Sequence, residues 1–483
     1  MNVARNWVER GWYGQLLNGE PAPPGLTAAF PTVASVALSF KLLGVGIWQG
    51  RLALVFYVFT ALILLYALGV RLYDRRVGAA AVIVTLIASA DPSIHPIFLG
   101  RQVLAELPML VFLLFGYLSL WWALQRSRWW LVVACGAWGL ALITKAQTLP
   151  FWAISLLLPA VLVAIKRRWQ LFAVLAVALI GSYVASRLWS VAIDLLLQGH
   201  TLPTPQPEGL TDVTAVVLIP QVRVALLILV MQIGLPTLLG LSYIAWRWLR
   251  RVEPLETHQQ WLRLSAWSLA ASWLGWYILL SRGSPRYAFP AIFVGSIFVA
   301  ALLGDLTAHF DFAATLARVN RMFKTRQFDR RTVSAMLFLT LLLAMIVLNL
   351  QWAAAYVAQA VSSEAPLADV VTYLNSRTPS GALIETYDSE LFVLLDRPYH
   401  FPPDQTHIAL IRDVTRRNFG IDEEASAADR ELLNYDPLAA APDYLVVGPA
   451  HEVWRRLYEP VLTSGAVRLV YATTHYQVYA RAP

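Results

Sequence analysis

The stretch FLGRQVLAELPMLVFLLFGYLSLWW, residues 98–122, decides the class of fold. It ends in a long apolar run of the kind that crosses a hydrocarbon core about 30 Å thick as a helix. A cation, Arg101, and a carboxylate, Glu106, stand where this run begins. Charge is costly to desolvate near the membrane interior, so the stretch predicts a membrane helix with two candidate functional residues near its first turn.

The composition of the whole chain agrees with a membrane protein. Of its 483 residues 58% are hydrophobic and 14% are charged, and the mean hydropathy is +0.56. A single cysteine, Cys135, permits no internal disulfide. The net charge of +8 comes from short basic loops between apolar segments, which the positive-inside rule explains better than nucleic-acid binding.

Hydropathy predicts a polytopic α-helical protein with about ten membrane spans. The predicted spans are residues 48–70, 78–94, 103–124, 130–144, 147–165, 169–189, 223–246, 264–280, 287–304 and 333–355. Basic loops mark the cytoplasmic side, at residues 71–76, 125–128, 166–168, 247–251 and 318–331. The outer side receives residues 1–47, 95–102, the turn at Lys145, residues 199–215, 281–286 and the C-terminal domain.

The chain divides into three predicted segments: an outer loop at 1–47, a membrane domain at 48–360 and a small α/β domain at 361–483 outside the cytoplasm. Residues 27–47 are expected to form an interfacial helix, with an eleventh span as the alternative. Residues 1–26 are polar and hold no signal peptide or spanning helix that would carry them outside. A further helix upstream of Met1 is therefore expected.

Cations gather on the predicted outer side, where positive charge is normally scarce. Lys145 lies between two apolar halves, and Arg282 and Arg286 belong to SRGSPRYAFP. One interpretation is a snorkelling lysine and an interfacial anchor loop. In the other, these residues and Arg101 form a pocket for an anion, most simply a phosphate, at the level of the lipid headgroups.

Glu106 also allows two interpretations. Pro108 two residues later suits the first turn of a helix, where an acid interacts favourably with the helix dipole. Alternatively, the carboxylate orients or deprotonates an acceptor beside the anion pocket.

Six segments in a fixed order carry a resemblance to a known family: ARNWVERGWY, PP, FKLLGVGIWQGRLALVF, GRQVLAELPML, GLALITK and SPRYAFPAIF. In this order, over residues 4–305, the chain resembles the C-type membrane glycosyltransferases, in the branch of protein O-mannosyltransferases and lipid A aminoarabinose transferases. The resemblance implies an amphipathic first outer loop and a soluble C-terminal domain. It also implies inverting transfer of a sugar from a polyprenyl phosphate at the outer face of the membrane.

Individual residues match the motifs of that family. Glu106 matches the acid of the second outer loop, Arg101 the basic residue before it, and Lys145 a lysine near the carrier phosphate. Arg286 and Tyr287 match the Arg-Tyr pair before a late span, also on the phosphate side.

The chain departs from the family in two places. The principal acid of the family precedes the counterpart of ARNWVERG, so its position falls upstream of Met1. The lysine that stands beside PP in the family is absent from APPG at residues 22–25. The resemblance therefore implies either a start site further upstream or an inactive relative.

The predicted function is transfer of a sugar from a polyprenyl-phosphate donor, similar to dolichyl-phosphate mannose, to an external protein, lipid or glycan. The reaction is expected at the plasma membrane, in protein glycosylation or cell-envelope assembly, without a metal or cofactor. Cations hold the leaving phosphate, and a carboxylate activates the acceptor from the opposite face. The alternatives are a transporter or flippase of lipid-linked sugars and an inactive assembly subunit.

The C-terminal segment alternates helix-like runs, LADVVTYLNSR and AHEVWRRLYEPVL, with β-like runs, ALIETY, YLVVG, RLVYATT and YQVYAR. It is expected to cover the outer cavity or bind acceptor. Asp388, Asp396 and His400 are expected in surface or loop roles.

Overall fold

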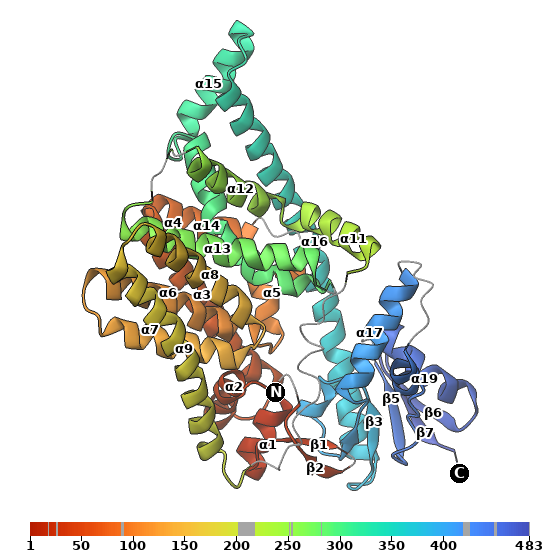
Figure 1. The fold of residues 1–483 in the computed structure, drawn as a ribbon. Helices are drawn as coiled ribbons and strands as arrows, with labels where there is room; N and C mark the ends of the chain where they lie inside the picture. The colour runs from red at the N-terminus through yellow and green to blue at the C-terminus, as the bar shows by residue number, and fades with distance from the viewer. Residues whose placement is uncertain are drawn as a thin grey trace. The chain divides into compact units, whose positions relative to one another are not determined.

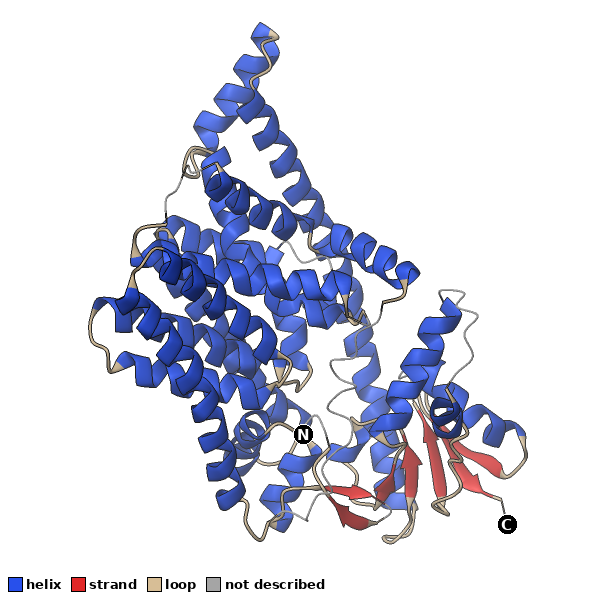
Figure 2. Ribbon diagram, in the orientation of Figure 1, coloured by secondary structure: helices blue, strands red, loops and turns tan. Residues whose placement is uncertain are grey.

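The protein is described by a computed structural model that covers residues 1–17, 19–25, 28–87, 91–200, 218–250, 252, 255–281, 283–418, 426–448 and 452–482. Figures 1 and 2 show the fold as a ribbon. The chain forms two compact units. The first contains Met1–Ala53, Leu196–Val213 and Ala355–Pro483, and the second contains Leu54–Leu195 and Thr214–Ala354. The first and last of the three predicted segments thus belong to one compact unit.

The membrane part is a bundle of mainly apolar helices. The helices are α3 (Ile47–Leu72), α4 (Arg75–Ile87), α5 (Pro96–Arg101), α6 (Glu106–Gln125), α7 (Trp130–Thr144), α8 (Thr148–Ile165), α9 (Trp169–Leu196), α11 (Pro220–Ile233), α12 (Leu235–Leu249), α13 (His258–Leu279), α14 (Phe289–Leu306), α15 (Phe312–Thr325) and α16 (Arg330–Arg377). Two 3₁₀ turns, η1 (Pro92–Ile94) and η2 (Pro285–Ala288), lie before α5 and α14.

Each predicted span falls on a helix, but the helices differ in length. Among the described residues, six segments are long and apolar enough to cross a membrane: α3, α6, α8, α9, η2 with α14, and Arg330–Ala358 of α16. With 13 and 15 residues, α4 and α7 are shorter than the roughly 20 residues of a full span. The polytopic helical fold class is confirmed, while the number of spans stays a prediction.

Two predicted spans need correction. The segment 223–246 is not one straight helix, because α11 and α12 meet at an angle of 91°. Gly234 ends α11, and Pro236, which has no N–H, is the second residue of α12. The helix predicted over 78–94 ends at Ile87, and Pro92–Ile94 form η1, which the Asp91 carboxylate caps by accepting from the Ser93 N–H at 2.7 Å.

Small residues allow close packing in the membrane part. A Cβ at Gly240 of α12 would lie 2.7 Å from the backbone nitrogen of Val299 in α14. One at Gly139 of α7 would lie 2.9 Å from the backbone of Ala185 in α9. Helix pairing in a bilayer relies on such close approach, because lipid supplies no hydrophobic drive between helices.

The C-terminal part of the first unit is the small α/β domain that the sequence predicts. Its strands are β3 (Ile384–Thr386), β4 (Tyr399–His400), β5 (Tyr444–Val447), β6 (Val467–Ala472) and β7 (Gln477–Arg481). The sheet order is β4-β3-β5-β7-β6. β3 pairs in parallel with β4 and β5, and β7 pairs antiparallel with β5 and β6.

Helices and a buried core complete this domain. The helices are the end of α16, α17 (Asp404–Asn418), α18 (Ala427–Leu433) and α19 (Glu452–Thr463), with the 3₁₀ turn η3 (Leu391–Val393). Leu374 of α16 packs with Ile384, Val446 and Val478 of the sheet in one buried cluster. All four predicted β-like runs therefore contain a strand.

The N-terminal residues belong to the same unit as this domain. They form α1 (Asn2–Arg10), the hairpin β1 (Gln15–Leu17) and β2 (Glu20–Ala22), and the apolar helix α2 (Phe30–Leu43). The Arg5 guanidinium donates to the carbonyls of Val393 and Leu395 at 3.0 and 2.7 Å and pairs with Asp396 at 2.7 Å. Asp396 is thus exposed, as expected, but it holds an ion pair between the two ends of the chain.

Removing the Arg5 contacts is expected to loosen α1 from the C-terminal domain. Arg5→Ala leaves two carbonyls and a carboxylate without their donor, which lowers the free energy of unfolding by about 1–3 kcal/mol. Thermal unfolding and protease cleavage within residues 1–17 measure the effect. Arg10→Ala, on the exposed last turn of the same helix, is the matched control. Equal protection of α1 in both variants would contradict the role of Arg5.

A buried carboxylate organises the core of the C-terminal domain. Glu385 in β3 is fully buried and accepts from the hydroxyls of Tyr435 and Tyr458 at 2.8 and 2.5 Å. His400 Nδ1 also contacts Glu385. His400 is therefore half-buried rather than a surface residue, and Asp388 is buried as well.

Stability of this domain is expected to fall at alkaline pH. Burial, with the neighbouring Glu385 carboxylate, raises the pKa of the Tyr458 and Tyr435 hydroxyls above the ordinary value of about 10. A raised folded-state pKa means that the stabilisation is complete below pH 10 and is lost as pH rises further. In Tyr458→Phe, the melting temperature should fall less steeply with rising pH than in the wild type. Tyr471 stacks on Tyr373, and Tyr471→Phe should keep the wild-type dependence. If the melting temperature of Tyr458→Phe depends on pH as that of the wild type does, Tyr458 is not a cause of the alkaline loss of stability.

Candidate functional site

Glu106 is the first residue of α6 and lies at the centre of the candidate site. Ala105 precedes the helix, and Pro108 fits its first turn because the missing N–H has no intrahelical partner there. The residue is only 3% exposed. A carboxylate buried this deeply needs positive partners, because desolvating it alone costs several kcal/mol.

Two cations from distant parts of the chain supply that compensation. Lys145 Nζ donates to Glu106 Oε1 at 2.5 Å. Arg286 Nε lies 3.9 Å from the same oxygen, which is an ionic approach but too long for a hydrogen bond. The turn between α7 and α8 carries Lys145, and η2 carries Arg286.

Local backbone structure explains how Lys145 reaches Glu106. Lys145 ends α7 with extended angles, φ −151° and ψ 103°, and its carbonyl accepts from the N–H of Thr148 as α8 begins. The lysine is thus held in a tight break between two helices. Since α6 packs beside α7 (Figure 1), the break lies within reach of the start of α6.

Tyr287 lines the same site beside both cations. Lys145 Nζ lies 5.1 Å from the centre of its ring, and the Arg286 guanidinium carbon lies 5.5 Å from it. Such distances allow cation–π attraction. The ring also neighbours Trp276 of α13 at 6.3 Å, and the Tyr287 carbonyl accepts from the Trp273 indole at 2.9 Å.

The net charge of this group of side chains favours an anion. Two cations face one carboxylate, so the group carries a net positive charge. The Arg286 side chain is 37% exposed, whereas the side chains of Lys145 and Glu106 are 15% and 4% exposed. Arg286 Nε has no hydrogen-bond partner among the described residues. Of the two cations that approach Glu106, Arg286 is thus the more exposed.

The structure brings together Glu106, Lys145, Arg286 and Tyr287 from the sequence-based set. Arg101 is the last residue of α5, on the connection into α6, and is half-buried. Arg282 lies outside the described residues. No group of three or more metal-ligating side chains occurs in the described part of the chain.

The sequence-based set does not include Gln147 or the aromatic residues of α8 and α13, which lie near these residues in the chain or pack near Tyr287. Gln147 is 2% exposed and directly precedes α8. Phe151 lies 4.5 and 5.3 Å from the ring centres of Trp273 and Trp276. The only available signal was the proximity of Gln147 to Lys145 in the sequence, since an aromatic residue in a membrane helix is unremarkable.

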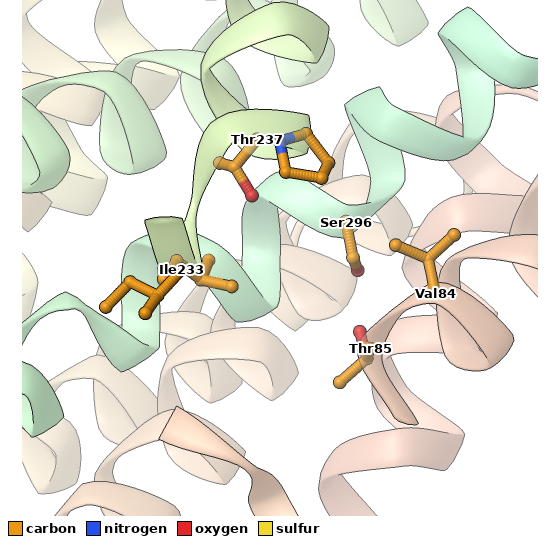
Figure 3. A pocket seen from close by; sticks show the side chains of 7 residues that line it. Val84, Thr85, Ile233, Thr237 and Ser296 are labelled. Carbon is orange, nitrogen blue, oxygen red and sulfur yellow. The ribbon is translucent and has the colours of Figure 1, made fainter. Parts of the chain in front are cut away.

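A small pocket lies elsewhere in the membrane part, at the bend between α11 and α12. Figure 3 shows its seven lining residues, all uncharged: Val84, Thr85, Ile233, Pro236, Thr237, Ile292 and Ser296. None of the sequence-predicted site residues belongs to this lining.

Comparison with known proteins supports a common fold. Residues 31–189 match the family described as dolichyl-phosphate-mannose-protein mannosyltransferase. ArnT from Cupriavidus metallidurans, bound to undecaprenyl phosphate, is similar with a TM-score of 0.59 and 15% identity, over 99% of this chain and 92% of that one. An oligosaccharyltransferase from Archaeoglobus fulgidus is similar with a TM-score of 0.50 and 12% identity, over 100% and 70%. No curated protein sequence matches the chain significantly.

The chain thus has the fold of the C-type membrane glycosyltransferase superfamily, which confirms the resemblance seen in the sequence. More particularly, the segment that contains Arg101, Glu106 and Lys145 is the one that matches the mannosyltransferase family. The protein is a multi-pass membrane protein with a small C-terminal sheet domain.

The Glu106–Lys145 pair is expected to show strong coupling in a double-mutant cycle. Glu106→Gln and Lys145→Met should each destabilise the protein, because each leaves the other residue poorly compensated. The double variant should lose less than the sum, with a coupling energy of about 0.5–3 kcal/mol. Thermal unfolding in detergent measures each variant. Glu106→Gln combined with Lys324→Met, an exposed lysine of α15, should be additive. An additive Glu106–Lys145 cycle would refute the pairing.

Proposed function

We propose that this protein transfers a sugar from a polyprenyl-phosphate donor to an acceptor at the outer face of the plasma membrane. The single observation that carries the proposal is the meeting of Lys145 and Arg286 with Glu106 at the start of α6. The glycosyltransferase fold, and the undecaprenyl phosphate named for ArnT, support a lipid-linked donor. The acceptor is proposed only as an external hydroxyl or amine of a protein, lipid or glycan.

The proposed reaction is a single displacement at the anomeric carbon. The bond from that carbon to the phosphate oxygen breaks, and the phosphate leaves with the electron pair. Lys145 and Arg286 hold this leaving group, and Arg101 and Arg282 are proposed to add to the same positive field. Tyr287 holds the two cations in place through its ring.

Glu106 is proposed to act on the acceptor. The acceptor oxygen or nitrogen attacks from the face opposite the phosphate, which inverts the anomeric carbon. Its proton passes to the Glu106 carboxylate, a positioned general base. Binding of the phosphate by Lys145 would free the carboxylate oxygen that the lysine contacts at 2.5 Å in this structure.

A transport function has less support. Transporters often place ionisable residues at broken helices near the middle of the bilayer. The broken pair α11 and α12 has uncharged residues around its bend. The buried charges of the candidate site instead lie where α6 begins and α7 ends. This placement favours chemistry at the edge of the membrane.

Variants should separate donor binding from the chemical step. Lys145→Met and Arg286→Met each remove a charge-assisted contact worth about 1.5–3 kcal/mol, so donor affinity should fall roughly ten- to hundredfold. Glu106→Gln keeps the shape of the side chain but cannot take a proton, so kcat should fall more than affinity. Release of undecaprenyl phosphate from labelled undecaprenyl-phosphate sugars, with cell membranes as the acceptor source, measures both effects.

Lys324→Met is the control, because this lysine is exposed on α15. Wild-type turnover of Lys145→Met and Arg286→Met at both limiting and saturating donor would refute the phosphate site. Wild-type turnover of Glu106→Gln would leave Glu106 as an acid at a helix terminus.

A further inference from the structure

Gln147 is a buried polar residue whose side-chain amide is unpaired within the described part of the chain. It is 2% exposed, and both its amide oxygen and its amide nitrogen lack a hydrogen-bond partner among the described residues. A primary amide offers two donors and one acceptor. Leaving them unmet in the interior is unfavourable, and such groups call for an explanation such as a functional role or a bound molecule.

The contacts of neighbouring residues locate Gln147 beside the candidate site. Two residues earlier in the chain, Lys145 contacts Glu106 and approaches the Tyr287 ring. One helical turn later, Phe151 lies on the same face of α8 and packs against Trp276. Trp276 in turn neighbours Tyr287 at 6.3 Å. Gln147 is therefore two residues from the lysine of the candidate site and one helical turn from a ring that packs on Trp276.

This combination of groups suits a sugar. Each sugar hydroxyl both donates and accepts a hydrogen bond, as the amide of Gln147 does. The C–H faces of a sugar ring are apolar enough to pack on the aromatic rings of Tyr287 and Trp276. A phosphate could accept from the amide N–H groups, but an ionised phosphate has no donor for the amide oxygen, whereas a sugar hydroxyl can satisfy both.

We infer that Gln147, with Tyr287 and Trp276, forms the subsite that binds the sugar of the lipid-linked donor and selects it through its hydroxyl groups. This inference rests on the proposed function and extends it from the phosphate to the sugar. The amide is sealed from solvent in this structure, so a neighbouring side chain must move when the donor enters. Lys145 is suited to move, because its long stem can turn from Glu106 to the donor phosphate.

Gln147→Met tests the inference, because methionine has similar size and no hydrogen-bonding amide. The purified full chain is tested with undecaprenyl phosphate and with its mannosyl and aminoarabinosyl derivatives. In the variant, affinity for the preferred sugar-bearing lipid should fall about 5- to 100-fold. Affinity for undecaprenyl phosphate itself should stay unchanged. The thermal stability of the ligand-free variant should equal or exceed that of the wild type, because an unmet amide has been removed.

Ser119→Ala is the matched control. The Ser119 hydroxyl is also buried without a partner among the described residues. It lies 13 positions after Glu106 on α6, which is about 20 Å along the helix. This variant should bind all the lipids as the wild type does.

Each remaining outcome has a definite meaning. If Gln147→Met is less stable without ligand and binds all the lipids normally, Gln147 has a structural role and the inference is wrong. The inference also fails if the wild type binds no sugar-bearing lipid better than undecaprenyl phosphate. If the wild type binds undecaprenyl phosphate and its derivatives not at all, the proposed function itself fails.

Discussion

The need to neutralise one buried carboxylate constrains the membrane part of this protein. Glu106 is almost fully buried at the start of α6, and a carboxylate there is tolerated only with cations close by. Those cations come from the break between α7 and α8 and from η2 before α14. Three separate parts of the chain must therefore meet at one point. The ends of these helices are fixed by charge as well as by hydrophobic length.

The same region also contains buried polar groups that lack hydrogen-bond partners in the described part of the chain. Arg286 Nε and the Gln147 amide are buried without hydrogen-bond partners among the described residues, although the aromatic residues around them pack closely. A chain selected for stability alone would replace such groups with apolar ones. Their presence beside the ion pair is the pattern expected where binding, rather than packing, determines the residue.

The first compact unit shows how distant segments can form one body. Arg5 binds carbonyls of the turn that ends η3, and the backbone N–H of Leu16 donates to the Tyr399 hydroxyl at 3.3 Å. Arg51 also lies 3.7 Å from Glu390. The N-terminal segment and the C-terminal domain are therefore linked by polar contacts across more than 300 residues of sequence.

The sequence by itself determined the helical membrane class, the positions of the apolar helices and the strands of the C-terminal domain. These features depend on local hydropathy and periodicity, which act within about 20 residues. It also indicated Glu106, Lys145 and Arg286 as candidates. Only the tertiary structure decided the bend at Gly234, the partner of each charge and the burial of Gln147. Those features depend on contacts between residues far apart in the chain, which a local pattern does not encode.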